Sequence, residues 1–276
     1  MINDIGIVDT KKIIAAINDA YSIDFSSLAL TAFKRRVLKV MNDHNYSSIV
    51  DFIHRLENDA QLFGKYLSEG MIDTTEMFRD PSFWRDLRDV HLPNLFKTYG
   101  KINVHIPGVT SGDDVYSFVI LLKESGFLNK TKIIVSSLSQ LRLDAIKNGA
   151  IYDIRKMENS EANHKRFSGS FELSDYYSIE SNKAIMNSEL VENIEFKKYS
   201  YLQDSPLTGQ HLILYRNKMI YCNATLQDKI GQKLFDSLLT GGILCVGSRE
   251  NIETGPFARK LLTLNSVEKI YKKRTA

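Results

Sequence analysis

Residues 102–122 read INVHIPGVTSGDDVYSFVILL and contain three structural units in a row. The first five residues alternate apolar and polar side chains, which is typical of a short strand. Gly108 to Gly112 form a loop, and the apolar run that begins at Val115 indicates a helix. The stretch therefore predicts a strand, a glycine loop and a helix, the repeating unit of doubly wound α/β sheets.

The alternation of strands and helices continues toward the end of the chain. Further strands are expected at 133–135, 194–196, 212–215 and 243–246, and further helices at 138–147 and 226–239, the last ending at Gly241-Gly242. Strands that alternate with helices indicate a parallel, doubly wound sheet. Residues from about 153 to 190 break this pattern, because they are polar with short alternating pieces, and we expect a small antiparallel β insertion there.

The first third of the chain is expected to be helical. Its apolar residues recur at helical spacing, as in Ile13, Ile14, Ile17 and Tyr21 and again in Phe33, Val37, Leu38 and Met41. We therefore divide the chain into an N-terminal helical domain, residues 1–90, and an α/β domain, residues 91–276, with the β insertion at about 153–190.

Composition excludes several classes of protein. A net charge of +3 is too small to indicate a nucleic-acid partner. No apolar run approaches the roughly 20 residues of a membrane helix, and the first residues lack the features of a signal peptide. Cys222 and Cys245 are far apart, and metal-binding motifs are missing from the sequence. We expect a cytoplasmic protein with reduced cysteines, no metal site, no membrane insertion and no nucleic-acid binding.

One basic cluster stands out in the first third of the chain. Residues 1–90 carry 11 Lys and Arg against 14 Asp and Glu, and four of the basic residues, Lys34, Arg35, Arg36 and Lys39, lie close together. Two interpretations fit such a cluster: a solvated helix face, and a contact surface for an acidic partner. The residues themselves leave both open.

A candidate for binding a carboxylate lies ahead of the first strand. Residues 74–80 read TTEMFRD, so that Arg79 stands beside two hydroxyls and two carboxylates. A guanidinium is always charged and presents a planar fork of donors that matches a carboxylate. Such a segment is often only a solvated helix end, but its position before the glycine loop makes Arg79 a candidate site residue.

Polar residues follow two of the expected strands, at the edge where doubly wound folds bind their ligands. Gly108 and Gly112 allow the backbone to approach a ligand closely. Asp113 and Asp114 suit either the dipole of the next helix or the ammonium group of a ligand. The loop is neither Gly-x-Gly-x-x-Gly nor a Walker motif, which weakens the dinucleotide and triphosphate interpretations.

The second polar segment, YRNKMIY at residues 215–221, follows the expected strand at 212–215. Several hydrogen-bonding side chains at a strand's carboxyl end favour a binding site. The structural alternative is that Tyr221 packs in the core while Arg216 pairs with a neighbour.

Four segments, in this order, resemble motifs of the CheR-type chemotaxis receptor methyltransferases. TEMFR at 75–79 is similar to the family's Thr-x-Phe-Phe-Arg, and GVTSGDDVYS at 108–117 to its Gly-Cys-Ser-x-Gly-Glu-Glu-Pro-Tyr-Ser. RNKMIY at 216–221 is similar to Arg-Asn-Val-x-Ile-Tyr, and GGILCVGSRE at 241–250 to Gly-Gly-x-Leu-x-x-Gly-His-Ser-Glu. The resemblance covers nearly the whole chain. It implies a helical domain followed by a Rossmann-like, S-adenosylmethionine-dependent methyltransferase domain with a small antiparallel β insertion.

The resemblance also implies an activity. The family transfers a methyl group from S-adenosyl-L-methionine to glutamate side chains of methyl-accepting chemotaxis receptors, which yields glutamyl methyl esters and S-adenosyl-L-homocysteine. It implies a monomer that acts on the receptor's cytoplasmic domain during adaptation. An ionised carboxylate is already a nucleophile, so attack on a sulfonium methyl group mainly requires orientation and exclusion of water.

Individual residues take roles from the same resemblance. Arg79 and Tyr221 would flank the methyl group and orient the incoming carboxylate. The cofactor would be contacted by Thr75, Arg79, Gly108, Thr110, Gly112, Asp113, Ser137, Ser200, Tyr201, Arg216 and Asn217. The receptor would be met by Lys34, Arg35, Arg36 and Lys39, and its tail would be tethered by the β insertion.

The sequence departs from the family in the cofactor pocket. Ser137 replaces the acid that grips the ribose hydroxyls, Ser200 replaces an asparagine, and the loop's two glutamates are shortened to Asp113 and Asp114. A hydrogen bond to a charged group contributes about 1.5–3 kcal/mol against about 1 kcal/mol for a neutral one, which predicts roughly three- to thirtyfold weaker cofactor binding. The alternative function is a catalytically weak or inactive CheR-like module that binds receptors or regulates them.

Overall fold

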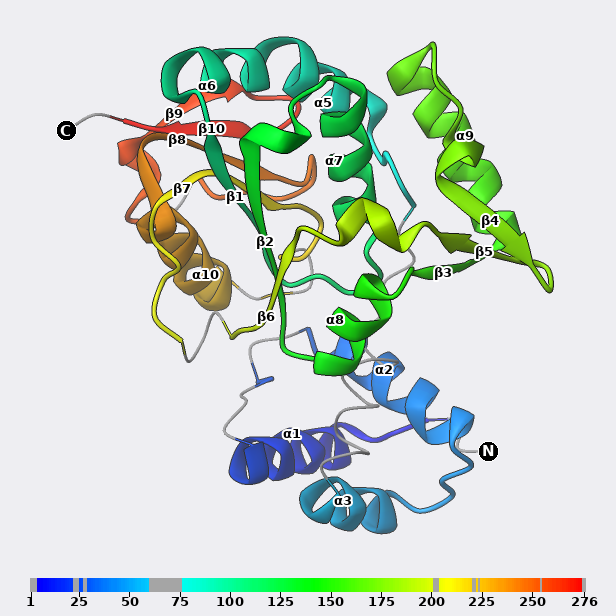
Figure 1. Cartoon of the computed structure of the whole chain (residues 1–276). Coiled ribbons are helices and arrows are strands. Elements are labelled where there is room, and N and C mark those ends of the chain that lie inside the picture. Colours follow the sequence, from blue (N-terminus) through cyan, green and yellow to red (C-terminus); the bar gives the residue numbers. More distant parts are fainter. Residues whose placement is uncertain are drawn as a thin grey trace.

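The structure is a computed structural model (Figure 1), and it describes residues 4–21, 25–26, 29–59, 76–200, 204–219, 222, 224–253 and 255–274. Three N-terminal helices come first: α1 (Ile7–Tyr21), α2 (Leu30–Asp43) and α3 (Ile49–Asn58). In Figure 1 they lie together below the α/β domain, next to α8 (Gln140–Lys147).

The N-terminal helices pack through one apolar face each, and their buried side chains include Ile13, Ile17, Phe33, Val37, Val40, Phe52 and Leu56. Ser48 caps α3 by accepting a hydrogen bond from the Asp51 backbone N–H at 3.3 Å. Leu138, which follows the second strand of the α/β domain, packs against the same cluster. The two parts of the chain therefore share apolar contacts.

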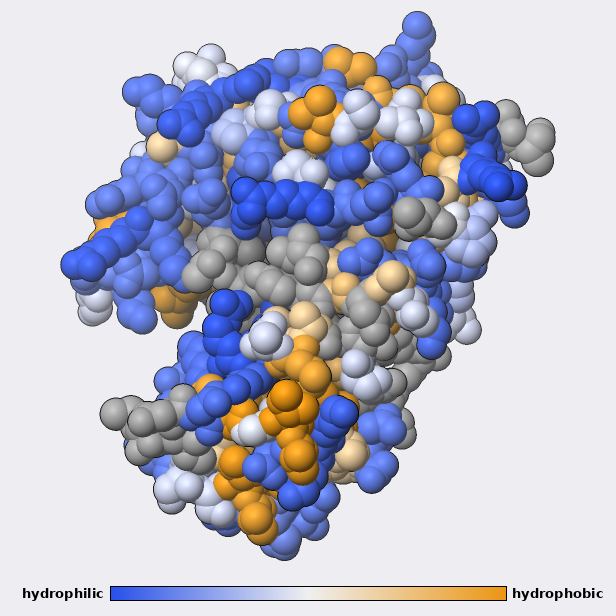
Figure 2. Space-filling view, turned by 180° about the vertical axis from the view of Figure 1, so that it is seen from behind, coloured by the Kyte–Doolittle hydropathy of each residue, from blue (hydrophilic) through white to orange (hydrophobic). Residues whose placement is uncertain are grey.

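Some apolar side chains of these helices remain at the surface. Figure 2 shows a largely hydrophilic face on which apolar residues gather over the N-terminal helices. The large hydrophobic residues that α1 and α3 expose are Ile7, Val8 and Val50, each at least 66% exposed. Exposed apolar residues that are scattered singly are normal on a protein surface.

A seven-stranded sheet forms the centre of the α/β domain, in the order β6-β2-β1-β7-β8-β10-β9. Its strands are β1 (Ile102–Ile106), β2 (Thr131–Ser137), β6 (Glu195–Lys198), β7 (Gln210–Tyr215), β8 (Leu238–Val246), β9 (Leu261–Asn265) and β10 (Ile270–Lys273). The first five in chain order are parallel, as predicted. The strand order reverses between β1 and β7, and such a switch point is where doubly wound folds bind ligands.

The sheet is mixed rather than purely parallel, because β10 runs antiparallel to both β8 and β9. The sequence analysis missed these last two strands. The first, LLTLN, lacks clean alternation and exposes Leu262 and Leu264 at the sheet edge, and the second, IYKK, is only four residues long. Gly241 and Gly242 were also misplaced, because they lie inside β8 instead of ending a helix.

Helices cover the sheet and make up its connections (Figure 1). They are α5 (Pro81–Asp86), a π-helical turn (Leu87–His91), α6 (Leu92–Tyr99), α7 (Asp113–Glu124), α8 and α10 (Ala224–Ser237). Nine of the twelve residues of α7 are buried, so it is a core helix that begins directly at the glycine loop. Met77, Phe78, Phe83 and Trp84 belong to the same core as the sheet.

The insertion between β2 and β6 contains a three-stranded antiparallel sheet, in the order β3-β5-β4, as expected. Its strands are β3 (Ile151–Asp153), β4 (Tyr177–Glu180) and β5 (Lys183–Met186). It also contains α9 (Ile154–Ser168), a 15-residue helix that the sequence analysis did not predict. Three of its five buried residues, Ser160, Asn163 and His164, are polar. The sequence of this helix therefore lacks the regular apolar spacing by which an amphipathic helix is predicted.

Candidate cofactor and methyl-transfer site

The glycine loop leaves the end of β1 in a conformation that needs glycine. Gly108 and Gly112 both have positive φ, 64° and 87°. A Cβ atom on Gly112 would lie 3.0 Å from Ile146 Cγ1 and 3.3 Å from Tyr152 Oη. The Tyr152 hydroxyl donates to the Ser111 carbonyl oxygen at 2.7 Å, so β3 of the insertion holds the loop in place.

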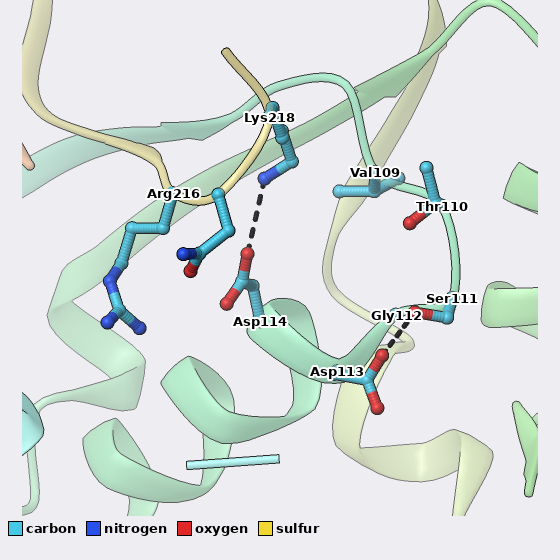
Figure 3. Close-up of a pocket in the computed structure, with 9 residues that line it drawn as sticks. Val109, Thr110, Ser111, Gly112, Asp113, Asp114, Arg216 and Lys218 are labelled. Atoms are coloured by element: carbon cyan, nitrogen blue, oxygen red, sulfur yellow. Dashed lines mark hydrogen bonds and ion pairs between the residues drawn. The ribbon is translucent and has the colours of Figure 1, made fainter. Parts of the chain in front are cut away.

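One pocket lies between this loop and the residues after β7 (Figure 3). It is lined by Val109, Thr110, Ser111, Gly112, Asp113, Asp114, Arg216, Asn217 and Lys218. Asp113 is 5% exposed and accepts a hydrogen bond from the Ser111 hydroxyl. Asp114 turns the other way, toward Lys218, whose Nζ lies 3.2 Å from its Oδ2 (Figure 3). The pocket therefore presents two carboxylates and one ammonium group.

A buried glutamate, which the sequence analysis did not assign to the site, fixes the turn after β7. Glu250 accepts hydrogen bonds from the backbone N–H groups of Asn217 at 2.9 Å, Gly247 at 2.6 Å and Met219. Asn217 has φ 57°, and a Cβ on Gly247 would lie 2.8 Å from the backbone nitrogen of Asn217. The signal in the sequence that could have identified Glu250 was its position as the last residue of the motif at 241–250.

Arg79 lies in a turn that leads into α5. Phe78 and Asp80, on either side of it, have φ of 53° and 56°, a conformation that is uncommon outside glycine and clusters at functional sites. Within the residues that the structure describes, no hydrogen bond or ion pair engages the Arg79 guanidinium. Among the described residues, none therefore competes with a ligand for its fork of donors.

Arg216 holds this turn from the other side. Its Nη2 lies 2.7 Å from Asp80 Oδ2, and its Nη1 donates to the Arg79 carbonyl oxygen at 3.1 Å. The guanidinium stacks on Phe83, with 3.9 Å from Cζ to the ring centroid, and points away from the glycine loop (Figure 3). Arg216 thus pairs with a neighbour, and its guanidinium does not face the pocket where a cofactor contact was expected.

The two serines that depart from the family both lie at the carboxyl edge of the sheet. Ser137, at the end of β2, donates to the Val109 carbonyl oxygen at 2.9 Å and is 5% exposed. Ser200 donates its backbone N–H to Asp204 Oδ2 at 2.8 Å. Asp204 brings a carboxylate to this edge, four residues from Ser200, where the sequence analysis had found no acid.

His105 lies in β1 and is completely buried. Its Nε2 is 2.8 Å from Ser136 Oγ, and burial, assisted by Lys218 and Lys197, lowers its pKa to about 3. The imidazole is therefore neutral near pH 7.

The basic cluster divides between the surface and the interior. Arg35 and Lys39 are exposed, Lys39 pairs with Asp43, and Lys34 pairs with Asp4. Arg36 is 7% exposed, so it does not belong to the exposed basic surface that the sequence analysis expected. Burial raises the pKa of Cys222 to about 11, and the charge of Arg36 opposes this rise, so α2 lies close to the segment after β7.

The predicted site residues thus have three outcomes. Thr110, Gly112, Asp113, Arg216 and Asn217 line one pocket, beside which Gly108 lies against Lys218. Arg79 does not line this pocket, but its carbonyl oxygen contacts Arg216, which does. Thr75, Tyr201 and Tyr221 lie outside the residues that the structure describes, and their roles stay predictions.

None of the described helices is long and apolar enough to cross a bilayer.

Comparison with known families accounts for both parts of the chain. Residues 73–266 match the CheR methyltransferase, SAM binding domain, and residues 9–69 match the CheR methyltransferase, all-alpha domain. The chain belongs to the CheR methyltransferase family. The predicted resemblance and fold class are thereby confirmed, and this CheR methyltransferase uses S-adenosylmethionine as cofactor and releases S-adenosylhomocysteine.

Individual relatives are similar along nearly their full length. The Pseudomonas putida protein Cher3 is 31% identical over 266 residues, which are 96% of this chain and 97% of that protein. A Listeria innocua protein named chemotaxis protein methyltransferase is 30% identical over 88% of this chain and 90% of its own length. A Listeria monocytogenes protein of the same name is 28% identical over the same shares.

The residues of the pocket fit the amino-acid end of the cofactor. This end carries an ammonium and a carboxylate group, and the pocket offers the Asp113 and Asp114 carboxylates and the Lys218 ammonium. The glycine loop allows close approach, and it leads into the N-terminus of a buried helix.

Proposed function

We propose that this CheR methyltransferase methylates glutamate side chains on the cytoplasmic domain of chemotaxis receptors, and that it acts in the cytoplasm. The observation that carries the proposal is the Arg79 turn, which Arg216 joins to the cofactor pocket and whose guanidinium no described residue engages. A guanidinium fork matches a carboxylate acceptor. The two Listeria relatives named chemotaxis protein methyltransferase support it.

The chemistry needs little from the protein beyond orientation. S-adenosylmethionine would supply a sulfonium methyl group. A glutamate oxygen would form a bond to this methyl carbon as the carbon–sulfur bond breaks, and the bonding electrons would go to sulfur, so that S-adenosylhomocysteine leaves. Arg79 holds the carboxylate in line with this methyl group, and by family resemblance Tyr221 flanks it. A glutamate ionised at neutral pH needs no general base, and the neutral His105 supplies none.

Arg79 is held ready for this task by its neighbours. Arg216 binds the Arg79 carbonyl oxygen and the Asp80 carboxylate, so the backbone of the turn is fixed while no described residue engages the Arg79 side chain. A fixed backbone lowers the entropy cost of orienting the acceptor. The two arginines thus have separate tasks: one binds the substrate carboxylate and the other holds the turn.

The receptor itself would be met by the N-terminal helices and the insertion. Lys34, Arg35 and Lys39 give α2 a basic outer face, which suits the acidic methylation region of a receptor. The small sheet of the insertion would tether the receptor's tail by strand addition, as the family resemblance implies.

The second candidate function, a weak or inactive module, rests on one observation. Polar groups of the pocket satisfy one another: Ser111 donates to Asp113, Lys218 pairs with Asp114, and Ser137 donates to the Val109 carbonyl oxygen. A ligand must replace some of these bonds, which lowers its net affinity.

Two measurements separate the candidates. Calorimetry with S-adenosylhomocysteine is expected to give a dissociation constant at the micromolar level, and no heat at millimolar ligand would leave only the binding module. Incubation of a receptor cytoplasmic fragment with methyl-labelled cofactor is expected to give base-labile label on glutamate. Cofactor binding without such label would overturn the proposed acceptor and leave cofactor binding standing.

A further inference from the structure

Lys218 is a cation in the cofactor pocket at a position where the family motif Arg-Asn-Val-x-Ile-Tyr has valine. Its Nζ lies 3.2 Å from Asp114 Oδ2, and the ion pair joins the segment after β7 to the start of α7 (Figure 3). The side chains of Lys218 and Asp114 are only 15% and 25% exposed. The pair therefore belongs to the pocket and not to the solvated surface.

The stem of Lys218 is laid along the glycine loop. A Cβ on Gly108 would lie 3.4 Å from Lys218 Cδ and 3.4 Å from Tyr215 Cε2, so the lysine and the ring both cover this glycine. The Lys218 ammonium lies 5.5 Å from the centroid of the Tyr215 ring, within the range of a cation–π contact. These contacts direct the ammonium group into the pocket.

Of the two basic residues that line the pocket, only Lys218 directs its charge into it. The Arg216 guanidinium is engaged by Asp80 and by the Arg79 carbonyl oxygen. The two acids also differ in their partners. Asp113 accepts a hydrogen bond from the Ser111 hydroxyl, whereas Asp114 faces Lys218. Lys218 and Asp114 thus form one carboxylate–ammonium pair at the mouth of the loop.

We propose that Lys218 and Asp114 bind the amino-acid end of the cofactor, Lys218 taking its carboxylate and Asp114 its ammonium group. An α-amino acid carries the two opposite charges on one carbon, and an Asp–Lys pair offers the complementary charges side by side. The ligand inserts between the two side chains, so that the Lys218 ammonium exchanges Asp114 for the ligand carboxylate and Asp114 exchanges Lys218 for the ligand ammonium group. The inference rests on cofactor binding alone and does not depend on the glutamate acceptor.

Burial gives this exchange its selectivity. A ligand with only one of the two charges breaks the Lys218–Asp114 pair and leaves one side chain without a partner in a partly buried site, which is costly. The pocket therefore prefers the complete amino-acid end over ligands that lack the carboxylate or lack the whole end.

Calorimetry with three ligands tests the assignment. The ligands are S-adenosylhomocysteine, its decarboxylated analogue, and methylthioadenosine, which lacks the amino-acid end. We expect Lys218→Met to weaken S-adenosylhomocysteine about tenfold or more, since a charged hydrogen bond is lost, and to leave the decarboxylated analogue no weaker. We expect Asp114→Asn to weaken both of these ligands and to leave methylthioadenosine unchanged.

Two further variants distinguish the loss of a specific ligand contact from a general loss of positive charge. Lys218→Arg keeps the charge and is expected to retain most of the affinity, whereas Lys229→Met, an exposed lysine of α10, controls for loss of charge. Thermal unfolding of each variant checks that it folds. The proposal is overturned if Lys218→Met binds S-adenosylhomocysteine as tightly as the wild type or more tightly, if it weakens the decarboxylated analogue equally, or if the wild type does not bind S-adenosylhomocysteine. Loss of receptor methylation with these affinities intact would contradict only the proposed acceptor.

Discussion

The hydroxyl of Ser160, in the insertion helix α9, accepts a hydrogen bond from the backbone N–H of Met77 at 3.1 Å, two residues before Arg79. Asn163 donates to the Met77 carbonyl oxygen at 3.3 Å, and the ring of Phe78 stacks on Phe167 at 4.9 Å between centroids. The insertion therefore holds the segment that carries Arg79, in addition to any contact with a receptor tail.

Ser160→Ala is expected to lower kcat for receptor methylation while the affinity for S-adenosylhomocysteine stays unchanged. The substitution leaves the Met77 N–H buried without its acceptor, which costs about 1–3 kcal/mol and loosens the Arg79 turn. Steady-state kinetics with a receptor fragment, alongside calorimetry, measure the two quantities. Lys165→Ala, on the exposed face of α9, is the control, and equal kcat values for the two variants would contradict the prediction.

Arg79→Ala is expected to reduce kcat/KM for the receptor by about a hundredfold or more without changing the melting temperature. In the proposed function the guanidinium makes charged hydrogen bonds to the acceptor carboxylate, and no described residue engages it in the free protein, so its loss is expected to affect transfer more than folding. Arg79→Lys keeps the charge but not the planar fork, so we expect it to recover only a minor part of the activity. A drop in melting temperature would show instead that Arg79 is structural.

Arg216→Met is expected to lower the free energy of unfolding by about 2–3 kcal/mol. Breaking a buried ion pair costs about 3–5 kcal/mol, and we place this pair lower because the Asp80 side chain is 32% exposed. Urea denaturation measures the loss, with Arg259→Met, an exposed arginine, as the control. If Arg216→Met were as stable as this control, the guanidinium would not be holding the turn.

The stability of the protein is expected to fall on acidification because of His105. Its pKa is about 3 in the folded chain and about 6.5 in an unfolded one. The unfolded state therefore binds a proton first, and folding loses stability as pH falls below 6.5 toward 3. Between pH 7 and pH 5 this amounts to about 2 kcal/mol.

Urea denaturation at pH 7 and pH 5 tests this sign and size. The loss between the two pH values is expected to shrink in His105→Gln by about 2 kcal/mol relative to the wild type, and to stay unchanged in His54→Gln, which removes an exposed histidine. An identical pH dependence in wild type and His105→Gln would show that His105 takes up its proton within the fold.

Much of the α/β domain could be predicted because its signals are local. Alternating apolar residues and two glycines at positive φ specify β1 and its loop within 11 residues. Short apolar runs at 133–135, 212–215 and 243–246 mark three of the other parallel strands. The helix α9 could not be predicted in this way, since its buried face uses Ser160, Asn163 and His164, and polar residues are buried only where distant partners satisfy them.

The sequence by itself determined the family, the cofactor and the kinds of charge at the site, because these depend on residue types in short motifs. Only the tertiary structure decided that Arg216 supports the Arg79 turn. Arg79 and Arg216 have the same chemistry, and both were expected at the cofactor. Arg216 became the support because the fold brings Asp80, 136 residues away, within 2.7 Å of its guanidinium, and no local pattern reports such a contact.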